Sequence, residues 1–202
     1  MAKPRNPPRQ QRSRETYERV LVVAAKTFEE LGYAGTTTNK VAEAAGISIG
    51  TLYHYFPDKD ALLYALADRH LAWAWESMME VFDRLREDEP GLEASLRAGI
   101  EVNVRLHVEE PRLHRLLYDT APRSDALLKR QRAADAAIAD EVARHFVRLG
   151  VATQQRSLVA RMLVAGVEAQ IHSALIDLAE PVEPELLTDA LTQLWLRALE
   201  GS

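Results

Sequence analysis

Two short helical patterns joined at a single glycine constrain the fold of this chain more than any other feature. The first pattern covers Thr38–Ala45 and the second covers Ser48–Phe56, with Gly46 at the joint. Ser48 suits the N-cap of the second helix, and Pro57 forces the residue before it out of the helical region. Apolar residues recur at helical spacing in both patterns, namely Val41, Ala42, Ala45, Leu52 and Phe56. Two short amphipathic helices with a small residue at the joint describe a helix-turn-helix.

The outward face of the second helix carries residues that suit contact with DNA. In a helix-turn-helix, the second helix enters the major groove, where its exposed side chains meet base edges and phosphates. The candidate DNA-binding residues are small, hydroxyl-bearing or aromatic, namely Ser48, Ile49, Gly50, Thr51, Tyr53, His54 and Tyr55. Residues two positions apart cannot point the same way on a helix, so we expect either Tyr53 or Tyr55 to pack beneath the first helix.

The residues around both helices resemble the DNA-binding domain of the TetR family of transcriptional regulators. The matching motifs are Gly32-Tyr33, Thr36-Thr37, Ala42 to Gly46, and Thr51-Leu52-Tyr53-His54-Tyr55-Phe56 with Lys59. The match covers Arg14 to Leu63, and beyond it only length and helical character agree. The resemblance implies an all-α fold, in which an N-terminal three-helix head is followed by a larger helical body for ligand binding and dimerisation.

Lys59 and the start of the first short helix supply candidate phosphate contacts. Asp58 and Asp60 suit the first turn of the helix that follows, whose positive dipole end does not favour a lysine. The position of Lys59 therefore suggests an external anion, and the resemblance gives the matching lysine the role of binding a DNA phosphate. The resemblance also implies DNA contacts by Thr38, Tyr53 and His54, and Asn39 is a further candidate beside Thr38.

Charge is distributed unevenly along the chain, which has 202 residues and a formal net charge of −5. Residues 1–60 carry nine Lys or Arg against seven Asp or Glu, a net charge of +2. Residues 61–202 carry sixteen against twenty-three, a net charge of −7. Attraction to phosphate needs only local positive charge, so this division favours a DNA-facing end on an acidic body. Ordinary scatter of surface charge is the alternative interpretation.

Several kinds of chemistry are excluded or disfavoured. The absence of cysteine excludes disulfides, thiolate nucleophiles and cysteine-ligated zinc. Gly46–Gly50 fits the G-x-S-x-G motif of hydrolases, but that motif needs a preceding strand, and a helix precedes it here. His107, Glu110 and His114 could be misread as metal ligands, although Pro111 interrupts the helix between them. We therefore expect no metal, no cofactor and no enzymatic activity.

The chain divides into three expected regions, which are a disordered basic arm at 1–12, a helix-turn-helix DNA-binding domain at 13–57 and a helical ligand-binding and dimerisation domain at 58–202. The arm could enter the minor groove or remain a solvated tail. No stretch approaches about 18 apolar residues, which predicts a soluble cytoplasmic protein without a membrane partner. About nine helices are predicted, over Ser13–Leu31, Thr38–Ala45, Ser48–Phe56, Pro57–Glu87, Leu92–Val108, Pro111–Asp119, Asp125–Leu149, Gln154–Ala179 and Leu186–Leu199.

A buried polar stripe in the body indicates a ligand cavity. The apolar positions Leu92, Leu96 and Ile100 continue along one helix face into Asn103 and His107. Polar groups on a buried face must find partners, either within the core or in a bound ligand. We expect a cavity between the fourth, fifth, seventh and eighth helices, and ordinary core packing is the alternative. The candidate ligand-binding residues are Trp73, Asn103, His107, Tyr118 and His172.

The last two predicted helices are candidates for a dimer interface. Gln154–Ala179 is apolar on more than one face, so most of its surface must be covered. Leu186–Leu199 adds a second apolar helix, and Gly166 and Ala169 would allow close approach. The resemblance implies a four-helix interface formed by these helices of two copies, and a purely internal core is the alternative.

These patterns together predict a sequence-specific transcriptional regulator, a ligand-released repressor that acts as a homodimer on a palindromic double-stranded DNA operator. The small-molecule effector and its mechanism follow from the resemblance, whereas DNA binding also follows from the residues. The first alternative is a helical-bundle small-molecule-binding protein or enzyme with a vestigial DNA-binding head. A second alternative is an adaptor that binds protein through the head. Salt-dependent binding to duplex DNA would separate both alternatives from a regulator.

Overall fold

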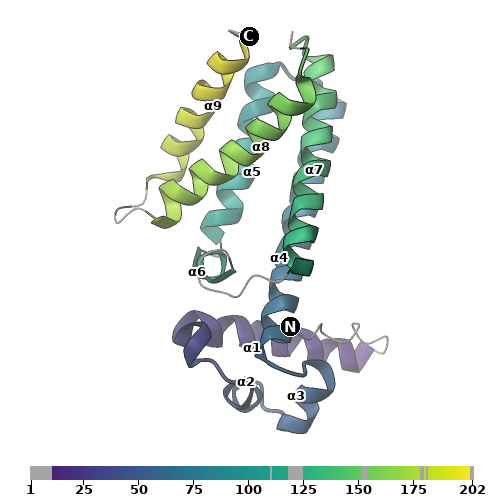
Figure 1. Cartoon of the computed structure of the whole chain (residues 1–202), viewed down its shortest axis with the longest axis vertical. Helices are drawn as coiled ribbons and strands as arrows, with labels where there is room; N and C mark the ends of the chain where they lie inside the picture. The colour runs from purple at the N-terminus through teal and green to yellow at the C-terminus, as the bar shows by residue number, and fades with distance from the viewer. Residues whose placement is uncertain are drawn as a thin grey trace. The chain divides into compact units, whose positions relative to one another are not determined.

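The computed structural model describes residues 11–109, 111–117, 125–151, 154–177, 180 and 182–200. Regular structure in these ranges is helical, and none of these residues lies in a strand (Figure 1). The helices are α1 (Gln11–Gly35), α2 (Thr38–Ala44), α3 (Ile49–Tyr55), α4 (Lys59–Asp88), α5 (Leu92–Glu109), α6 (Pro111–Arg115), α7 (Asp125–Arg148), α8 (Arg156–His172) with a π-helical turn at Ser173–Asp177, and α9 (Pro184–Glu200). The predicted all-α class is confirmed.

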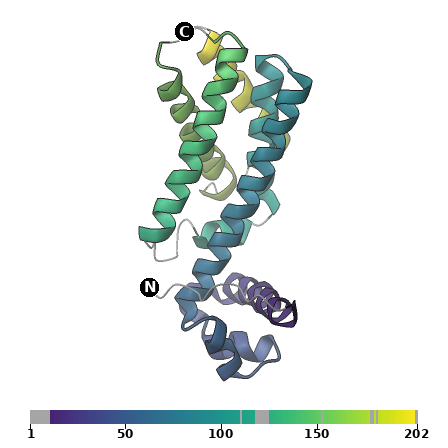
Figure 2. The same ribbon diagram turned by 90° about the vertical axis from the view of Figure 1, so that its right-hand side faces the viewer.

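The chain forms two compact units. The first, called the head below, extends to Leu71 and includes described residues of Arg112–Leu128. The second, called the body, comprises 72–111 and 129–202. α4 is one continuous helix that passes from the head into the body (Figure 2). The expected boundary after residue 57 therefore falls inside the head, because the first turns of α4 contribute to the core of that unit.

The core of the head joins α1 to both short helices and to the start of α4. Phe56 is fully buried, and its ring stacks on that of Tyr17 with centroids 4.8 Å apart. The remaining buried side chains include Val20, Leu21, Ala24, Phe28, Val41, Ala42, Leu52, Leu62, Leu66, Leu116 and Leu117. The apolar faces expected from the sequence for the two short helices are thus the faces that the core covers.

Local turn chemistry fixes the position of α3. Gly46 has φ +65°, a conformation that side chains with a Cβ rarely adopt, and it turns the chain between α2 and α3. Ser48 is the N-cap of α3, and its Oγ accepts a hydrogen bond from the Thr51 backbone nitrogen at 3.1 Å. Phe56, the residue before Pro57, is extended with φ −130° and ψ 105° and ends the helix. The predicted cap, turn and stop are confirmed.

The body packs around α5. One apolar cluster joins α5 to α7, α8 and α9, and a second joins α4, α5 and α7. Close approach of α8 and α9 depends on Gly166, where an added Cβ would lie 2.7 Å from Cζ2 of Trp195. The Trp195 ring nitrogen donates to Oε1 of Gln170 on α8 at 3.1 Å. Gly166 therefore serves packing within one chain, whereas the sequence had suggested a role between two copies.

One helical segment of the described chain is long and apolar enough to cross a membrane. It spans Arg156–Ile176, has a mean hydropathy of 1.2, and 28% of its most apolar part is buried. Reading the sequence for continuous apolar runs missed this segment. Its inner face carries Ala160, Leu163, Val167 and Ile171 and packs into the body core. Packing into the core therefore accounts for the apolar residues of this inner face, whereas most of the segment is not buried.

Candidate nucleic-acid interface and ligand cavity

The residues of α3 separate into a buried and an exposed face. Leu52 is fully buried in the head core. Tyr53 is 46% exposed and Ile49 is 36% exposed. The exposed side of α3 and its N-cap consists of Ser48, Ile49, Gly50, Thr51, Tyr53 and His54. Six of the seven residues that the sequence assigned to this helix as DNA contacts therefore face solvent.

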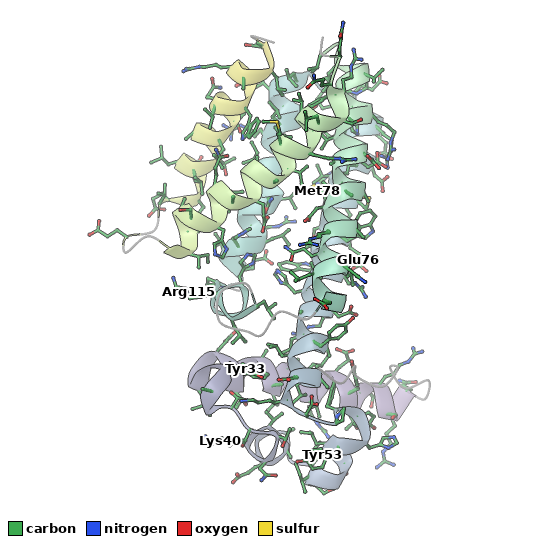
Figure 3. The ribbon with its side chains drawn as sticks, in the orientation of Figure 1. Tyr33, Lys40, Tyr53, Glu76, Met78 and Arg115 are labelled. Carbon is green, nitrogen blue, oxygen red and sulfur yellow. The ribbon has the colours of Figure 1, made fainter. Side chains whose placement is uncertain are left out.

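The exposed face of α3 continues onto the start of α2. The hydroxyl oxygens of Thr38 and Tyr53 lie 3.2 Å apart, and Asn39 beside Thr38 is exposed. The side chains of Ser48 and Thr51 are linked in the same way, with their hydroxyl oxygens 2.8 Å apart. Figure 3 shows Tyr53 on α3 and Lys40 on α2 within this part of the head. The structure thus brings residues of two helices together into one hydroxyl-rich surface.

Tyr55 lies on the other side of α3. Its hydroxyl is 2.8 Å from Oγ of Ser13 on α1, and its ring meets the edge of the Tyr17 ring with centroids 6.1 Å apart. Because a helix turns about 100° per residue, Tyr55 cannot share the outward direction of Tyr53. The geometry therefore favours a packing role for Tyr55 over the DNA contact expected from the sequence.

Lys59 has acceptors within the head. Its ammonium donates to the backbone oxygen of Tyr33 at 2.9 Å and to that of Thr36 at 3.5 Å. The same nitrogen lies 4.1 Å from the centroid of the Tyr33 ring. Carbonyl groups at the end of a helix attract cations, so these contacts explain a lysine in the first turn of α4 without an external anion. The local charge pattern thus no longer indicates an external anion, and phosphate binding by Lys59 stays a prediction from the resemblance.

Two further polar contacts at the C-terminal end of α1 were not predicted from the sequence. The Lys40 ammonium donates to the backbone oxygen of Gly35 at 2.9 Å. The hydroxyl of Tyr33 donates to a carboxylate oxygen of Asp60. Burial, followed by this hydrogen bond, raises the pKa of Tyr33 to about 12. Tyr33 and Asp60 are far apart in sequence, so only the packing of α1 against α4 reveals this polar network.

A cavity of about 150 Å³ lies in the body, between α4, α5, α7 and α8. These are the four helices between which the sequence predicted a cavity. Its wall is mostly apolar and includes Met78, Phe82, Leu85, Leu96, Ile100, Ile138, Val142, Phe146, Leu163 and Val167. Met78 is labelled on α4 in Figure 3. The polar lining residues are Ser95, Asn103, Asp135, His145 and Glu168.

Of the five predicted ligand-binding residues, Asn103 lines this cavity. Three others lie outside its wall, and one lies outside the described residues. His107 is 1% exposed and is not part of the cavity wall. Its Nδ1 donates to the backbone oxygen of Asn103 at 2.9 Å, and its Nε2 lies 3.6 Å from Oε1 of Glu168. Trp73 and His172 are half-buried and also lie outside the wall, and Tyr118 lies outside the described residues. The geometry therefore makes His107 a neighbour of the polar wall, one layer behind it.

Four polar wall residues, Ser95, Asp135, His145 and Glu168, were not predicted, although the sequence contains a signal for two of them. Asp135 and His145 occur at helical spacing with Ile138, Val142 and Leu149, which together form the cavity-facing side of α7. Burial, followed by the charge of Glu168, raises the pKa of Asp135 to about 6. Burial, followed by the charge of Arg148, lowers the pKa of His145 below its ordinary value. The helical spacing of Asp135 and His145 with apolar residues is therefore the sequence signal that places both on the inward face of α7.

Comparison with known families identifies the chain. The family described as bacterial regulatory proteins, tetR family, matches residues 20–66. The family described as tetracyclin repressor-like, C-terminal domain, matches residues 91–199, more than half of the chain. The chain belongs to the TetR family. The predictions of this family and of a helix-turn-helix transcriptional regulator are confirmed.

Relatives of this TetR-family chain are similar over part of their length. The HTH-type transcriptional regulator RutR of Escherichia coli strain K12 is 33% identical over 97 residues, covering 48% of this chain and 43% of RutR. The HTH-type transcriptional regulator SAUSA300_2515 of Staphylococcus aureus strain USA300 is 37% identical over 59 residues, covering 29% of this chain and 32% of that protein. The chain thus spans less than half the length of these relatives.

Solved structures of transcriptional regulators share the fold over nearly the whole chain. A TetR-family transcriptional regulator from Mesorhizobium loti MAFF303099 has a TM-score of 0.75 at 21% identity, covering 94% of this chain and 98% of that chain. A transcriptional regulator from Rhodococcus sp. RHA1 has a TM-score of 0.72 at 23% identity, covering 91% and 96%. At these identities the likeness concerns the fold alone.

Substitution of Lys59 by alanine separates its two possible roles. Loss of the hydrogen bond to the Tyr33 carbonyl should lower the free energy of unfolding of the head by about 1 kcal/mol. If the ammonium also reaches a phosphate, affinity for every duplex should fall nearly uniformly, and the slope of log affinity against log salt should fall by about one. Thermal melting and fluorescence anisotropy at several salt concentrations measure the two effects. Lys129→Ala, which removes an exposed lysine of the body, is the control. Lower stability with an unchanged salt slope would contradict the phosphate role.

Proposed function

We propose that this TetR-family regulator is a cytoplasmic repressor that binds a palindromic operator as a homodimer and is released by a small molecule. The observation that carries DNA reading is the exposed face of α3, where hydroxyl and aromatic side chains project while Leu52 and Phe56 anchor the helix. Such a face suits base edges and phosphates in the major groove. Two copies related by twofold symmetry would present two such helices to the two half-sites of a palindrome.

Two exposed apolar stripes support the dimer. On α8 the stripe follows helical spacing through Leu158, Met162, Ala165 and Ala169, and Met162 is 57% exposed. On α9 it runs through Leu186, Ala190 and Leu194, and Leu186 is 62% exposed. Apolar side chains at this spacing on adjacent helices suit packing against the same helices of a second copy. The occupant that we propose for both stripes is therefore another copy of this chain.

The continuity of α4 supports ligand control. Met78, Phe82 and Leu85 of this helix form part of the cavity wall in the body. Leu62 and Leu66 of the same helix lie in the core of the head. A ligand that displaces the cavity wall would shift α4 and with it the spacing of the two heads in a dimer. Release from DNA requires the ligand to bind the two arrangements with different affinities.

Matched tyrosine variants test the proposed DNA interface. Tyr53→Phe removes a hydroxyl from the exposed face, so operator affinity should fall about two- to twelvefold, the effect of a hydrogen bond of about 0.5–1.5 kcal/mol. Melting temperature should change little, because the contact of this hydroxyl with Thr38 is exposed to water. Tyr55→Phe removes the contact with Ser13 and should lower melting temperature without changing affinity. Sequencing of genomic fragments that the full chain protects would supply the operator, and anisotropy titrations would supply the affinities.

The opposite outcome for the two tyrosines would place the DNA-reading face on the other side of α3. A chain that binds no duplex DNA in a salt-dependent manner would overturn the regulator proposal as a whole. A chain that binds DNA only as a monomer would overturn the dimer alone.

A further inference from the structure

We infer that the small molecule recognised by the body is an apolar organic cation, an amine whose positive charge lies against Asp135 and Glu168. This inference rests on the proposed function, in which the cavity of the body binds the effector, and it assigns the chemical class of that effector. The cavity supplies three features, which are an acidic wall, a buried polar group without a partner and an apolar volume of limited size.

Two carboxylates line the cavity, and one of them, Glu168, has His107 Nε2 at 3.6 Å from its Oε1. Asp135 on α7 and Glu168 on α8 both line the cavity, and no lysine or arginine lines it. Asp135 makes no hydrogen bond or ion pair with any residue that the structure describes, and the residue is exposed to solvent. Asn103, on α5, adds a side-chain amide to the same wall. Two carboxylates that share a cavity repel each other, and a cation between them relieves that repulsion.

The titration of Asp135 is consistent with this arrangement. Burial and the charge of Glu168 raise the pKa of Asp135 to about 6, so at neutral pH most molecules still carry the negative charge. On the neighbouring helix α5, Nε2 of His107 lies 3.6 Å from Oε1 of Glu168. Binding of a cation would favour the charged carboxylate and lower its pKa.

A buried imidazole provides an independent indication of a ligand. His145 lines the cavity and is 7% exposed, and its Nδ1 has no hydrogen-bond partner. The ring is stacked on Phe82 with centroids 5.4 Å apart and an angle of 16° between the planes. A side chain needed only for packing would not carry a buried nitrogen that lacks a partner. A ligand that enters the cavity can supply that partner.

Asp135 and His145 lie towards opposite ends of the α7 side of the cavity. His145 lies ten residues after Asp135, a rise of about 15 Å along the helix axis, and Ile138 and Val142 lie between them on the same face. A ligand whose cation lies at the acidic end would therefore place its apolar part against Ile138 and Val142.

The volume of the cavity limits the size of the ligand. Its volume is about 150 Å³, and an apolar cavity of about that volume accommodates a single aromatic ring. Anionic ligands would meet two carboxylates, and neutral apolar ligands would leave the charge of Asp135 without a counter-charge. A compact amine with one ring satisfies both the charge and the volume.

Three probes of one shape test the inference with the full chain. Benzylamine is the cation, benzyl alcohol is the neutral analogue and benzoate is the anion. Ligand-observed NMR titrations at pH 7.5 should give a dissociation constant for benzylamine at least about tenfold lower than that for benzyl alcohol, as a charge-assisted contact provides. Benzoate should not bind. This comparison needs only the wild-type chain, so it stands whether or not a variant folds.

Variants on α7 test whether Asp135 supplies the negative charge that binds the amine. Asp135→Asn should remove the preference for benzylamine and leave benzyl alcohol binding unchanged, whereas Asp140→Asn, on the same helix but outside the cavity wall, should leave the preference intact. Equal binding of the alcohol and the amine, or an amine preference that survives Asp135→Asn, would overturn the inference. If either of these two results occurs and operator binding is normal, the proposed function as a regulator is unaffected. If operator binding is absent and the preference for the amine is intact, only the proposed function as a regulator is overturned.

Discussion

Leu194→Glu should leave the chain folded while abolishing both the dimer and operator binding. Leu194 is 51% exposed on α9 and belongs to the stripe that we propose as the contact with a second copy. In an isologous interface one substitution places two glutamates at the contact, and each buried unpaired charge costs several kcal/mol. The dissociation constant of the dimer should therefore rise about 1,000-fold or more. Sedimentation velocity and an anisotropy titration measure the two effects.

Leu191→Glu is the control for this experiment, because the two leucines lie on different faces of α9. Leu191 is 6% exposed and packs in the core of the body, so a glutamate there should unfold the body. Of these two leucines, only Leu194 therefore tests the interface without disturbing the core. A folded, dimeric Leu194→Glu chain with normal operator affinity would remove α9 from the interface.

Phe56→Ala should destabilise the head by about 3–5 kcal/mol, the range for loss of a buried aromatic ring. Phe56 is fully buried, stacks on Tyr17 and anchors the end of α3. Its loss would release both the C-terminus of α3 and the adjoining start of α4. Urea unfolding followed by circular dichroism gives the free energy, and hydrogen exchange should show faster exchange of the α3 amides.

Ile49→Ala provides the matched comparison for Phe56. It truncates a partly exposed side chain of the same helix, so the free energy of unfolding should change by no more than about 0.5 kcal/mol. Operator affinity should fall if Ile49 contacts a thymine methyl group. Similar losses of stability for both variants would mean that α3 is packed on both faces and cannot enter a groove.

The local features of the head followed from the sequence alone. The Ser48 cap, the turn at Gly46 and the stop before Pro57 each depend on residues within one helical turn of one another. The apolar spacing that predicted the buried faces of α2 and α3 is likewise a property of consecutive residues. These features identified the helix-turn-helix, and with the surrounding motifs they indicated the family.

The tertiary structure decided which side chains are exposed to solvent and which are packed against another helix. Tyr53 and Tyr55 have the same chemistry, and only the packing of α1 turns one outward and the other onto Ser13. The local charge pattern suggested an external anion for Lys59, and only the fold shows that the Tyr33 carbonyl lies within 2.9 Å of its ammonium.

The body shows the same division between local pattern and tertiary contact. The stripe on α5 indicated a cavity between the correct helices, but α7 and α8 supplied the Asp135, His145 and Glu168 that line it. The sequence determines what happens within a turn, because those residues are always neighbours. It leaves open which helix covers which face, since that depends on contacts between residues far apart in the chain.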